Sequence, residues 1–158
     1  MTTNNAATIE VVPCGAALGA EIRGVDLGAA PPAGVLDAIG AAWDEHLVLV
    51  LRGQRLQDEQ LLAFSRHFGA LDPPGANPYG EPFHKRHPEL NVISNLVENG
   101  RPQGNLGDGE AVWHADMTYV DRPPRGAALY ALEIPPGQGD TWFANMYAAF
   151  EALPAATW

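Results

Sequence analysis

The sequence predicts an α+β fold that is rich in short strands, and two observations support this class. Glycine and proline, at 17 and 14 of 158 residues, exceed average usage, and turn-rich chains of this length favour short strands and loops. Two segments with helical spacing lie in the first half, and mainly β-prone runs follow them. This order favours an α+β fold, or a β-rich barrel or sandwich, over a doubly wound sheet.

The length fits a single domain with a buried core, because a chain of about 150 residues buries roughly 68–70% of its unfolded surface. Hydrophobic residues make up 46% of the chain and charged residues 18%, which is typical of a globular protein. Residues 1–8 are small and polar, so we expect a flexible N-terminus. The folded domain is therefore expected over residues 9–158.

The charge balance indicates which kinds of binding partner the chain is suited to. Lysine and arginine number 9 and aspartate and glutamate 19, a formal charge of −10, which argues against nucleic acid or an anionic membrane. Cys14 is the single cysteine, which points to a reducing compartment. The first residues lack a secretory pattern, and the aliphatic run 47–51 is too short to span a bilayer. We therefore expect a cytoplasmic protein without a membrane partner.

The first half alternates short strands with helices. Residues 9–12 and 20–24 read as strands around a glycine-containing turn. Apolar residues at helical spacing follow Pro31-Pro32 and predict a helix from residue 33 to about His46. The apolar run 47–51 then reads as a buried strand.

The helix over residues 58–69 has the clearest pattern in the chain. It has acidic residues in its first turn, an apolar stripe, and Gly69 at its end.

The second half predicts strands separated by long loops, with a helix near residue 150. Segments 72–90 and 98–110 are rich in glycine, proline or polar residues and are expected to be loops. Asn145 is a suitable N-cap for a helix over the following residues. The predicted strands are residues 89–96, 111–119, 127–133 and 140–143.

The motif His114-Ala115-Asp116 carries the most specific chemistry. Side chains two apart on a strand project from the same face, so the imidazole and the carboxylate would point together. These are two of the three ligands of a 2-His-1-carboxylate site, which holds non-haem Fe(II). A structural ion pair is the alternative. The preceding glycine-rich loop and the flanking Trp113 and Tyr119 favour a site beside a cavity.

The chain resembles the taurine dioxygenase (TauD/TfdA) family of Fe(II)/2-oxoglutarate-dependent oxygenases. The resemblance rests on WHADMTY and on RPPRGAALYALEIPPGQGDTWFANMYAAFEALP at 122–154. Three N-terminal segments resemble the same family in the same order: GAEIRGVDL (19–27), HLVLVLRGQ (46–54) and LLAFSRHFGAL (61–71).

The resemblance implies a double-stranded β-helix (jelly-roll) core and assigns residues to roles. His114 and Asp116 would be the first two iron ligands, and Thr141 would contact 2-oxoglutarate. Asn95 and Met117 are candidates for lining the substrate pocket, with packing on a strand face as an equally good explanation. The family reaction is hydroxylation of a small organic substrate by O2, with decarboxylation of 2-oxoglutarate to succinate.

The chain also departs from the family pattern. The family's third iron ligand is a downstream histidine, followed by an arginine that pairs with 2-oxoglutarate, and no residue after Asp116 is a histidine. We therefore expect residues 9–158 to be the N-terminal part of a single such domain, with a jelly roll incomplete at the C-terminus. Such a part is expected to be inactive alone and to form homo-oligomers through unpaired strand edges.

Two other readings stay open. A jelly-roll half would serve as a non-catalytic binding or interaction module if His114 and Asp116 were only a structural pair. A cupin-like metal enzyme would instead take its third ligand from an upstream histidine: His46, His67, His84 or His87.

Overall fold

The structure is a computed structural model, and it describes residues 9–73, 82–104, 106 and 112–154. The predicted flexible N-terminus at 1–8 lies outside the described residues, as do parts of the two predicted loops and the first residue of the predicted strand 111–119. The chain divides into two units. The first runs to Phe68 and resumes at Tyr130, and the second is Gly69–Leu129.

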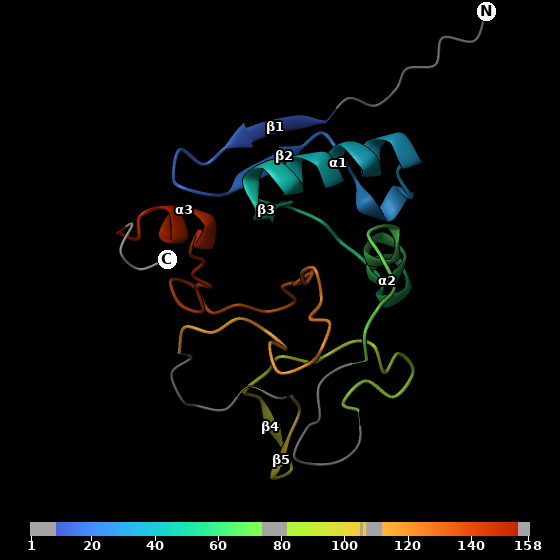
Figure 1. Ribbon diagram of the computed structural model, residues 1–158. Helices are drawn as coiled ribbons and strands as arrows, with labels where there is room; N and C mark the ends of the chain where they lie inside the picture. Colours follow the sequence, from blue (N-terminus) through green and yellow to red (C-terminus); the bar gives the residue numbers. More distant parts are fainter. Residues whose placement is uncertain (1–8, 74–81, 105, 107–111, 155–158) are drawn as a thin grey trace, which may run out of the picture. The chain divides into compact units, whose positions relative to one another are not determined.

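A three-stranded sheet and two helices form most of the first unit (Figure 1). The strands lie in the order β1-β2-β3, with β1 antiparallel to β2 and β2 parallel to β3. Register places Val11 opposite Ile22 and Ala20 opposite Leu49. The element bounds are β1 Glu10–Pro13, β2 Ala20–Arg23, the 3-10 helix η1 Leu27–Ala29, α1 Ala33–His46, β3 Leu49–Val50, α2 Asp58–His67 and α3 Met146–Glu151.

The core of this unit lies between the sheet and α1. Ile22 of β2 meets Val35, Ile39 and Ala42 of α1, and Ile39 is only 1% exposed. The spacing of these three helix residues gives α1 one apolar face, which the sheet covers. The helix ends where Leu47 takes a φ of 67° and donates its N–H to the Trp43 carbonyl.

Aromatic and amide contacts fix α2 beside α1 and η1. The ring of Phe68 meets Trp43 and Phe64 edge-on, at centroid separations of 5.9 and 5.1 Å. The Gln60 Oε1 atom accepts the Gln57 N–H at 2.7 Å, and its Nε2 donates to the Gly28 carbonyl at 2.8 Å. Gln60 therefore caps its own helix and ties it to η1.

A hairpin is the regular element of the second unit. Strands β4 (Val97–Glu98) and β5 (Arg101–Pro102) pair antiparallel around Asn99 and Gly100, whose φ values are 50° and 75°. Two positive φ values at Asn-Gly are the pattern of a type I′ turn. Beyond the strands, the Leu96 carbonyl accepts the Gln103 N–H, and the Ser94 carbonyl accepts the Leu106 N–H.

The helices and the first three strands confirm the predictions for the first half, with α2 ending at His67 and β3 shortened to two residues. The helix after Asn145 is also confirmed. The prediction of a loop over 98–110 missed the hairpin, and η1 was not predicted. In the described residues, helices and two small sheets together agree with an α+β class.

The predicted strands 89–96, 127–133 and 140–143, and the described part of 111–119, are wrong as regular strands. Their β-prone residues fit a pleated, half-buried surface, but a strand also needs a neighbour that takes its backbone hydrogen bonds. Among the described residues of these segments, Ser94 and Leu96 have backbone hydrogen bonds to the far arm of the hairpin, whereas those of Leu90 and Met117 close local turns.

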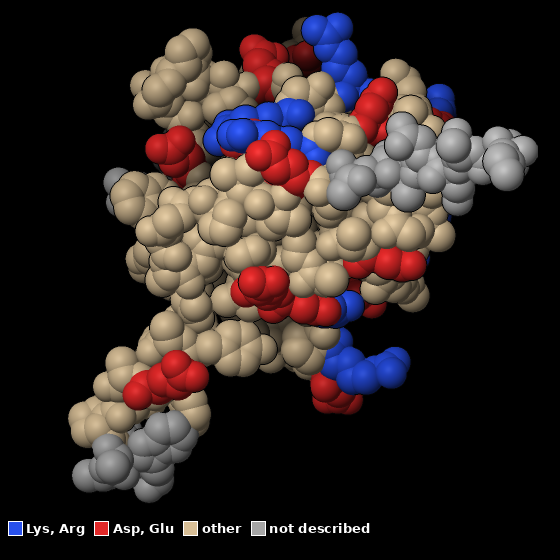
Figure 2. Space-filling view, turned by 90° about the horizontal axis from the view of Figure 1, so that it is seen from above, with Lys and Arg blue, Asp and Glu red and all other residues tan. Residues whose placement is uncertain are grey.

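No helix in the described part of the chain is both long enough and apolar enough to cross a membrane. On the face shown in Figure 2, acidic and basic side chains are interspersed among uncharged ones.

Candidate metal centre

His114 and Asp116 converge in the second unit. The His114 Nε2 atom lies 3.1 Å from Oδ1 of Asp116. The backbone here is not a strand: a turn begins at Asp116, Met117 has a φ of 51°, and the Val120 N–H donates to the Met117 carbonyl. The two side chains therefore meet as expected, but a turn brings them together and not the shared strand face on which the prediction relied.

A backbone contact orients the imidazole. The His114 Nδ1 atom lies 2.7 Å from the Val112 carbonyl oxygen, which can only accept a hydrogen bond, so Nδ1 carries the proton. In the neutral ring this leaves a lone pair on Nε2, the atom that faces Asp116. A carbonyl that holds the far nitrogen of a ligating histidine is the usual support of a metal site.

The separation of the pair fits a metal ion. Two neighbouring ligands of an octahedral first-row metal, each about 2.1 Å from it, lie about 3.0 Å apart. Imidazole nitrogen and carboxylate oxygen also form the donor set of non-haem iron sites. The side chains are 61% and 68% exposed, which leaves room for further ligands.

The same contacts change the acidity of the histidine. The hydrogen bond to the Val112 carbonyl raises the pKa of His114 above its ordinary value of 6.5, and the charge of Asp116 raises the pKa further. Both effects favour the imidazolium, which donates to acceptors on its two sides.

The other predicted site residues lie in different surroundings. Asn95 is exposed between Ser94 and Leu96 of the hairpin, and Met117 is half-buried beside the pair. Thr141 belongs to the first unit, on the exposed segment that precedes α3.

The upstream histidines have contacts of their own. His67 lies 3.0 Å from Asp37 and so joins α2 to α1. The rings of His84 and His87 stack with centroids 5.3 Å apart, and His84 Nδ1 accepts the His87 N–H. Within the described ranges, no three or more His, Cys, Asp or Glu side chains gather as a metal-binding group.

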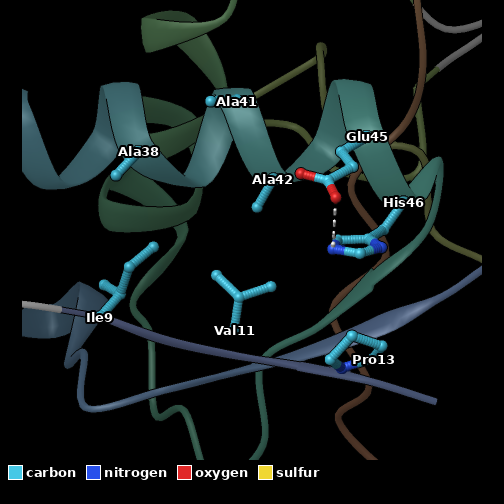
Figure 3. Close-up of a pocket in the computed structure, with 8 residues that line it drawn as sticks. All are labelled: Ile9, Val11, Pro13, Ala38, Ala41, Ala42, Glu45 and His46. Atoms are coloured by element: carbon cyan, nitrogen blue, oxygen red, sulfur yellow. Dashed lines mark ion pairs between the residues drawn. The ribbon is translucent and has the colours of Figure 1, made fainter.

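A groove of about 480 Å³ runs between β1 and α1 (Figure 3). Its walls are mostly apolar, and its polar end holds His46, whose Nε2 lies 3.9 Å from Oε1 of Glu45. His46, one of the alternative third ligands, is among its lining residues, whereas His114, Asp116, Asn95, Met117 and Thr141 are not. The lining residues are Ile9, Val11, Pro13, Ala38, Ala41, Ala42, Glu45 and His46.

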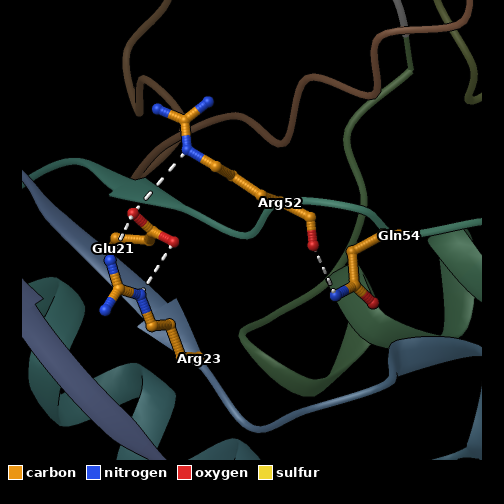
Figure 4. A network of polar contacts seen from close by, with 4 residues as sticks. All are labelled: Glu21, Arg23, Arg52 and Gln54. Atoms are coloured by element: carbon orange, nitrogen blue, oxygen red, sulfur yellow. Dashed lines mark hydrogen bonds and ion pairs between the residues drawn. The ribbon is translucent and has the colours of Figure 1, made fainter.

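A charged network lies on β2 and just after β3 (Figure 4). Glu21 accepts from Arg23 Nε at 3.0 Å, and Arg52 Nε lies 3.7 Å from its other oxygen. The hydrogen bond from Arg23 lowers the pKa of the Glu21 carboxyl. Gln54 continues the network inward, donating to the Arg52 and Val25 carbonyls and accepting the Leu27 N–H.

Sequence reasoning missed two tertiary contacts of the chain's last segment. The Tyr130 hydroxyl accepts the Leu56 N–H at 2.9 Å, and Asn145 Nδ2 donates to the Ala17 carbonyl at 2.7 Å. Periodicity carries no signal for contacts between residues so far apart in the sequence.

Comparison with known proteins gives the family context. The chain is 40% identical over 149 residues to a pentalenolactone F synthase of Streptomyces arenae. This alignment covers 92% of this chain and 48% of that protein. It is 34% identical over 143 residues to an alpha-ketoglutarate-dependent 2,4-dichlorophenoxyacetate dioxygenase of Cupriavidus pinatubonensis, covering 85% and 49%. A solved taurine dioxygenase from Burkholderia xenovorans matches with 36% identity and a TM-score of 0.47, over 58% of this chain and 31% of that one.

The chain spans about half the length of the curated relatives it matches. The model of the family described as taurine catabolism dioxygenase TauD, TfdA family, matches residues 10–157. The match covers nearly the whole chain, so this chain belongs to the TauD/TfdA family.

Proposed function

We propose that the protein containing these residues is an Fe(II)- and 2-oxoglutarate-dependent dioxygenase. It hydroxylates a small organic substrate with O2 and decarboxylates 2-oxoglutarate to succinate. The observation that carries the proposal is the 3.1 Å approach of His114 Nε2 to Asp116 Oδ1, in a chain that the family model matches over residues 10–157.

Each residue of the pair has a distinct part in holding the metal. His114 offers the Nε2 lone pair, and the Val112 carbonyl keeps its ring in the tautomer that exposes this lone pair. Asp116 offers an anionic oxygen at the neighbouring position. Iron, when bound, supplies the one-electron and O2 chemistry that side chains lack.

Three further residues have roles in the proposal. The Thr141 hydroxyl, which has one donor and two lone pairs, binds a carboxylate oxygen of 2-oxoglutarate. Asn95 and Met117 line the substrate pocket. Their positions beside the hairpin and beside the metal pair support this assignment.

We also propose that the domain is a jelly roll completed by strands outside these 158 residues, which supply the third iron ligand and the arginine for 2-oxoglutarate. Large apolar side chains that would pack in a complete domain support this idea, because they are exposed here. The most exposed are Leu132 at 86%, Val112 and Tyr119 at 78%, Trp142 at 76%, and Tyr147 at 72%. Burying them would stabilise the domain by about 1.5–3 kcal/mol for each fully covered side chain.

The relatives suggest where to begin the search for a substrate. Two of them are named for aryloxy acids, (S)-phenoxypropionate in Delftia acidovorans and 2,4-dichlorophenoxyacetate in Cupriavidus pinatubonensis. We propose a small organic acid as the substrate class. Its carboxylate gives an enzyme a fixed point of attachment from which to place a C–H bond beside the metal.

The test is succinate formation by the whole protein, supplied with Fe(II), 2-oxoglutarate and a panel of small carboxylic acids. We expect succinate and a hydroxylated product in equal amounts, and neither from the His114→Ala variant. Unchanged turnover in His114→Ala would contradict the proposed centre. Absence of any turnover or of 2-oxoglutarate binding in the intact protein would favour a non-catalytic binding module.

A further inference from the structure

The segment that carries Thr141 is held at both ends by side-chain hydrogen bonds to other parts of the first unit. At one end, the Tyr130 hydroxyl accepts the Leu56 N–H at 2.9 Å. At the other, Asn145 Nδ2 donates to the Ala17 carbonyl at 2.7 Å. Tyr130 and Asn145 are half-buried, whereas every residue from 131 to 144 is exposed.

Asn145 uses both ends of its amide. Its Oδ1 accepts the Ala148 N–H at 3.0 Å and so caps α3, while its Nδ2 reaches Ala17. The cap fixes which way the amide faces, because the oxygen must point to the helix and the nitrogen then points to the turn. A side chain without a donor at this place would keep the cap and lose the tether.

The anchor of this tether is exposed, but backbone hydrogen bonds join its turn to the folded elements of the first unit. Ala17 lies in the turn between β1 and β2, which the Cys14 N–H closes by donating to the Gly19 carbonyl at 2.9 Å. Gly19 in turn donates to the His46 carbonyl at the end of α1, at 2.8 Å. In Figure 1, α3 lies beside this turn. Asn145 therefore fixes the exposed segment to a turn that is itself hydrogen-bonded to the end of α1.

We propose that Asn145 is a positioning residue for 2-oxoglutarate: its amide tether holds Thr141, four residues earlier, in place to bind the co-substrate. This inference rests on the proposed function, in which Thr141 binds a carboxylate oxygen. A segment fixed at its ends has less conformational entropy to lose when the ligand binds. Loss of the tether should therefore raise the KM for 2-oxoglutarate and leave kcat unchanged at saturation.

The alternative is that Asn145 acts only as the cap of α3, and substitutions at this position separate the two roles. Asn145→Ser keeps a good neutral cap but has no donor that reaches Ala17. Asn145→Ala removes both functions. If only the cap matters, Asn145→Ser behaves as the native chain does.

The tether itself is measured on this chain, without iron or 2-oxoglutarate. Cys14 is its single cysteine and is exposed, so a nitroxide attached there lies at the turn that contains Ala17. We expect strong paramagnetic broadening of the amide signals of Met146–Glu151 in the native chain. In Asn145→Ser the broadening should weaken while α3 keeps its helical chemical shifts. Unchanged broadening in Asn145→Ser would overturn the tether, whatever the protein's activity.

The positioning role is measured in the whole enzyme. Loss of one neutral hydrogen bond predicts an increase of about three- to tenfold in the KM for 2-oxoglutarate in Asn145→Ser. A lower kcat with an unchanged KM would mark a merely structural role and overturn the inference. The inference is also overturned if Asn145→Ser leaves the KM for 2-oxoglutarate unchanged while Thr141→Val raises it. That outcome leaves the proposed function intact. If Thr141→Val also leaves KM unchanged, the co-substrate role of Thr141 fails, and the inference fails with it.

Discussion

The Nε2 atom of His114 lies 3.1 Å from Oδ1 of Asp116, and a turn at Asp116 brings the two side chains together. On the far side of the ring, Nδ1 lies 2.7 Å from the Val112 carbonyl. The imidazole thus lies between a backbone acceptor and a carboxylate. This arrangement supports either a proton or a metal ion on Nε2, and the two compete.

The acidity of His114 gives the first prediction. Its NMR titration in this chain should have a midpoint above 6.5, because the Val112 carbonyl and Asp116 both stabilise the imidazolium. Asp116→Asn should lower the midpoint only in part, since the hydrogen bond to the Val112 carbonyl, the largest single cause of the shift, remains. Asp121→Asn, a change to an exposed carboxylate nearby, serves as the control.

The raised pKa of His114 also determines how the stability of the folded chain depends on pH. Because the pKa of His114 is higher in the folded chain than in the unfolded chain, protonation of His114 stabilises the fold. This contribution is fully present below pH 6.5 and disappears as the pH rises through the folded-state pKa. A titration midpoint at or below 6.5 would show that these contacts do not form in solution.

Gly104 gives the second prediction. A Cβ atom there would lie 2.6 Å from the Ser94 nitrogen and 2.7 Å from the Val92 oxygen, both of them backbone atoms. Gly104→Ala should therefore force the hairpin arms apart, at a cost of about 1–3 kcal/mol, as for other overpacked sites. The measurement is amide hydrogen exchange at Gln103, whose N–H is bonded across the hairpin.

A second glycine offers a matched control. At Gly34, in the first turn of α1, an added Cβ meets no atom within 4 Å. Gly34→Ala should leave Gln103 exchange unchanged and stabilise α1 by about 0.5–1 kcal/mol, because glycine is a poor helix former. Equal exchange at Gln103 in the Gly104→Ala and native chains would contradict the close packing of this hairpin.

Thr141 gives the third prediction, in the whole enzyme. Thr141→Val keeps the β-branched shape and removes the hydroxyl. Losing one hydrogen bond to a charged ligand should weaken 2-oxoglutarate binding by about 1.5–3 kcal/mol, or roughly ten- to a hundredfold. An unchanged apparent affinity would return Thr141 to the role of an ordinary β-prone residue.

Self-association gives the fourth prediction. Leu132 is 86% exposed and Trp142 is 76% exposed, so this chain should form concentration-dependent oligomers in sedimentation experiments. Leu132→Ser should weaken the association, and Gln138→Ser, a change at an exposed polar residue of the same segment, should not. A strictly monomeric species with a sharp, cooperative melt would contradict the prediction.

The first half of the fold was predictable because its signals are local. Helical spacing placed α1 within a residue of its bounds, since the apolar face at Val35, Ile39 and Ala42 is also the face that packs. The Asn99-Gly100 pair carried a hairpin signal that the loop prediction over 98–110 did not use.

The later strands were not predictable from propensity alone. The segment containing Leu132 has β-prone residues, but pairing depends on a neighbouring strand, which the local sequence does not encode. At the site, His114 and Asp116 converge as expected, but a turn at Asp116 brings them together, whereas the prediction relied on a shared strand face. The Val112 carbonyl and the Asn145 tether are backbone and long-range contacts, and these leave no periodic pattern in a sequence.

The most direct test of the central claim is calorimetry of this chain with Fe(II) under argon. Two protein ligands leave most of the octahedral positions to water, so we expect weak binding that disappears in His114→Ala. His67→Ala, which removes a histidine bonded to Asp37 in the other unit, should bind iron as the native chain does. Tight iron binding that persists in His114→Ala would place the metal elsewhere and contradict the account.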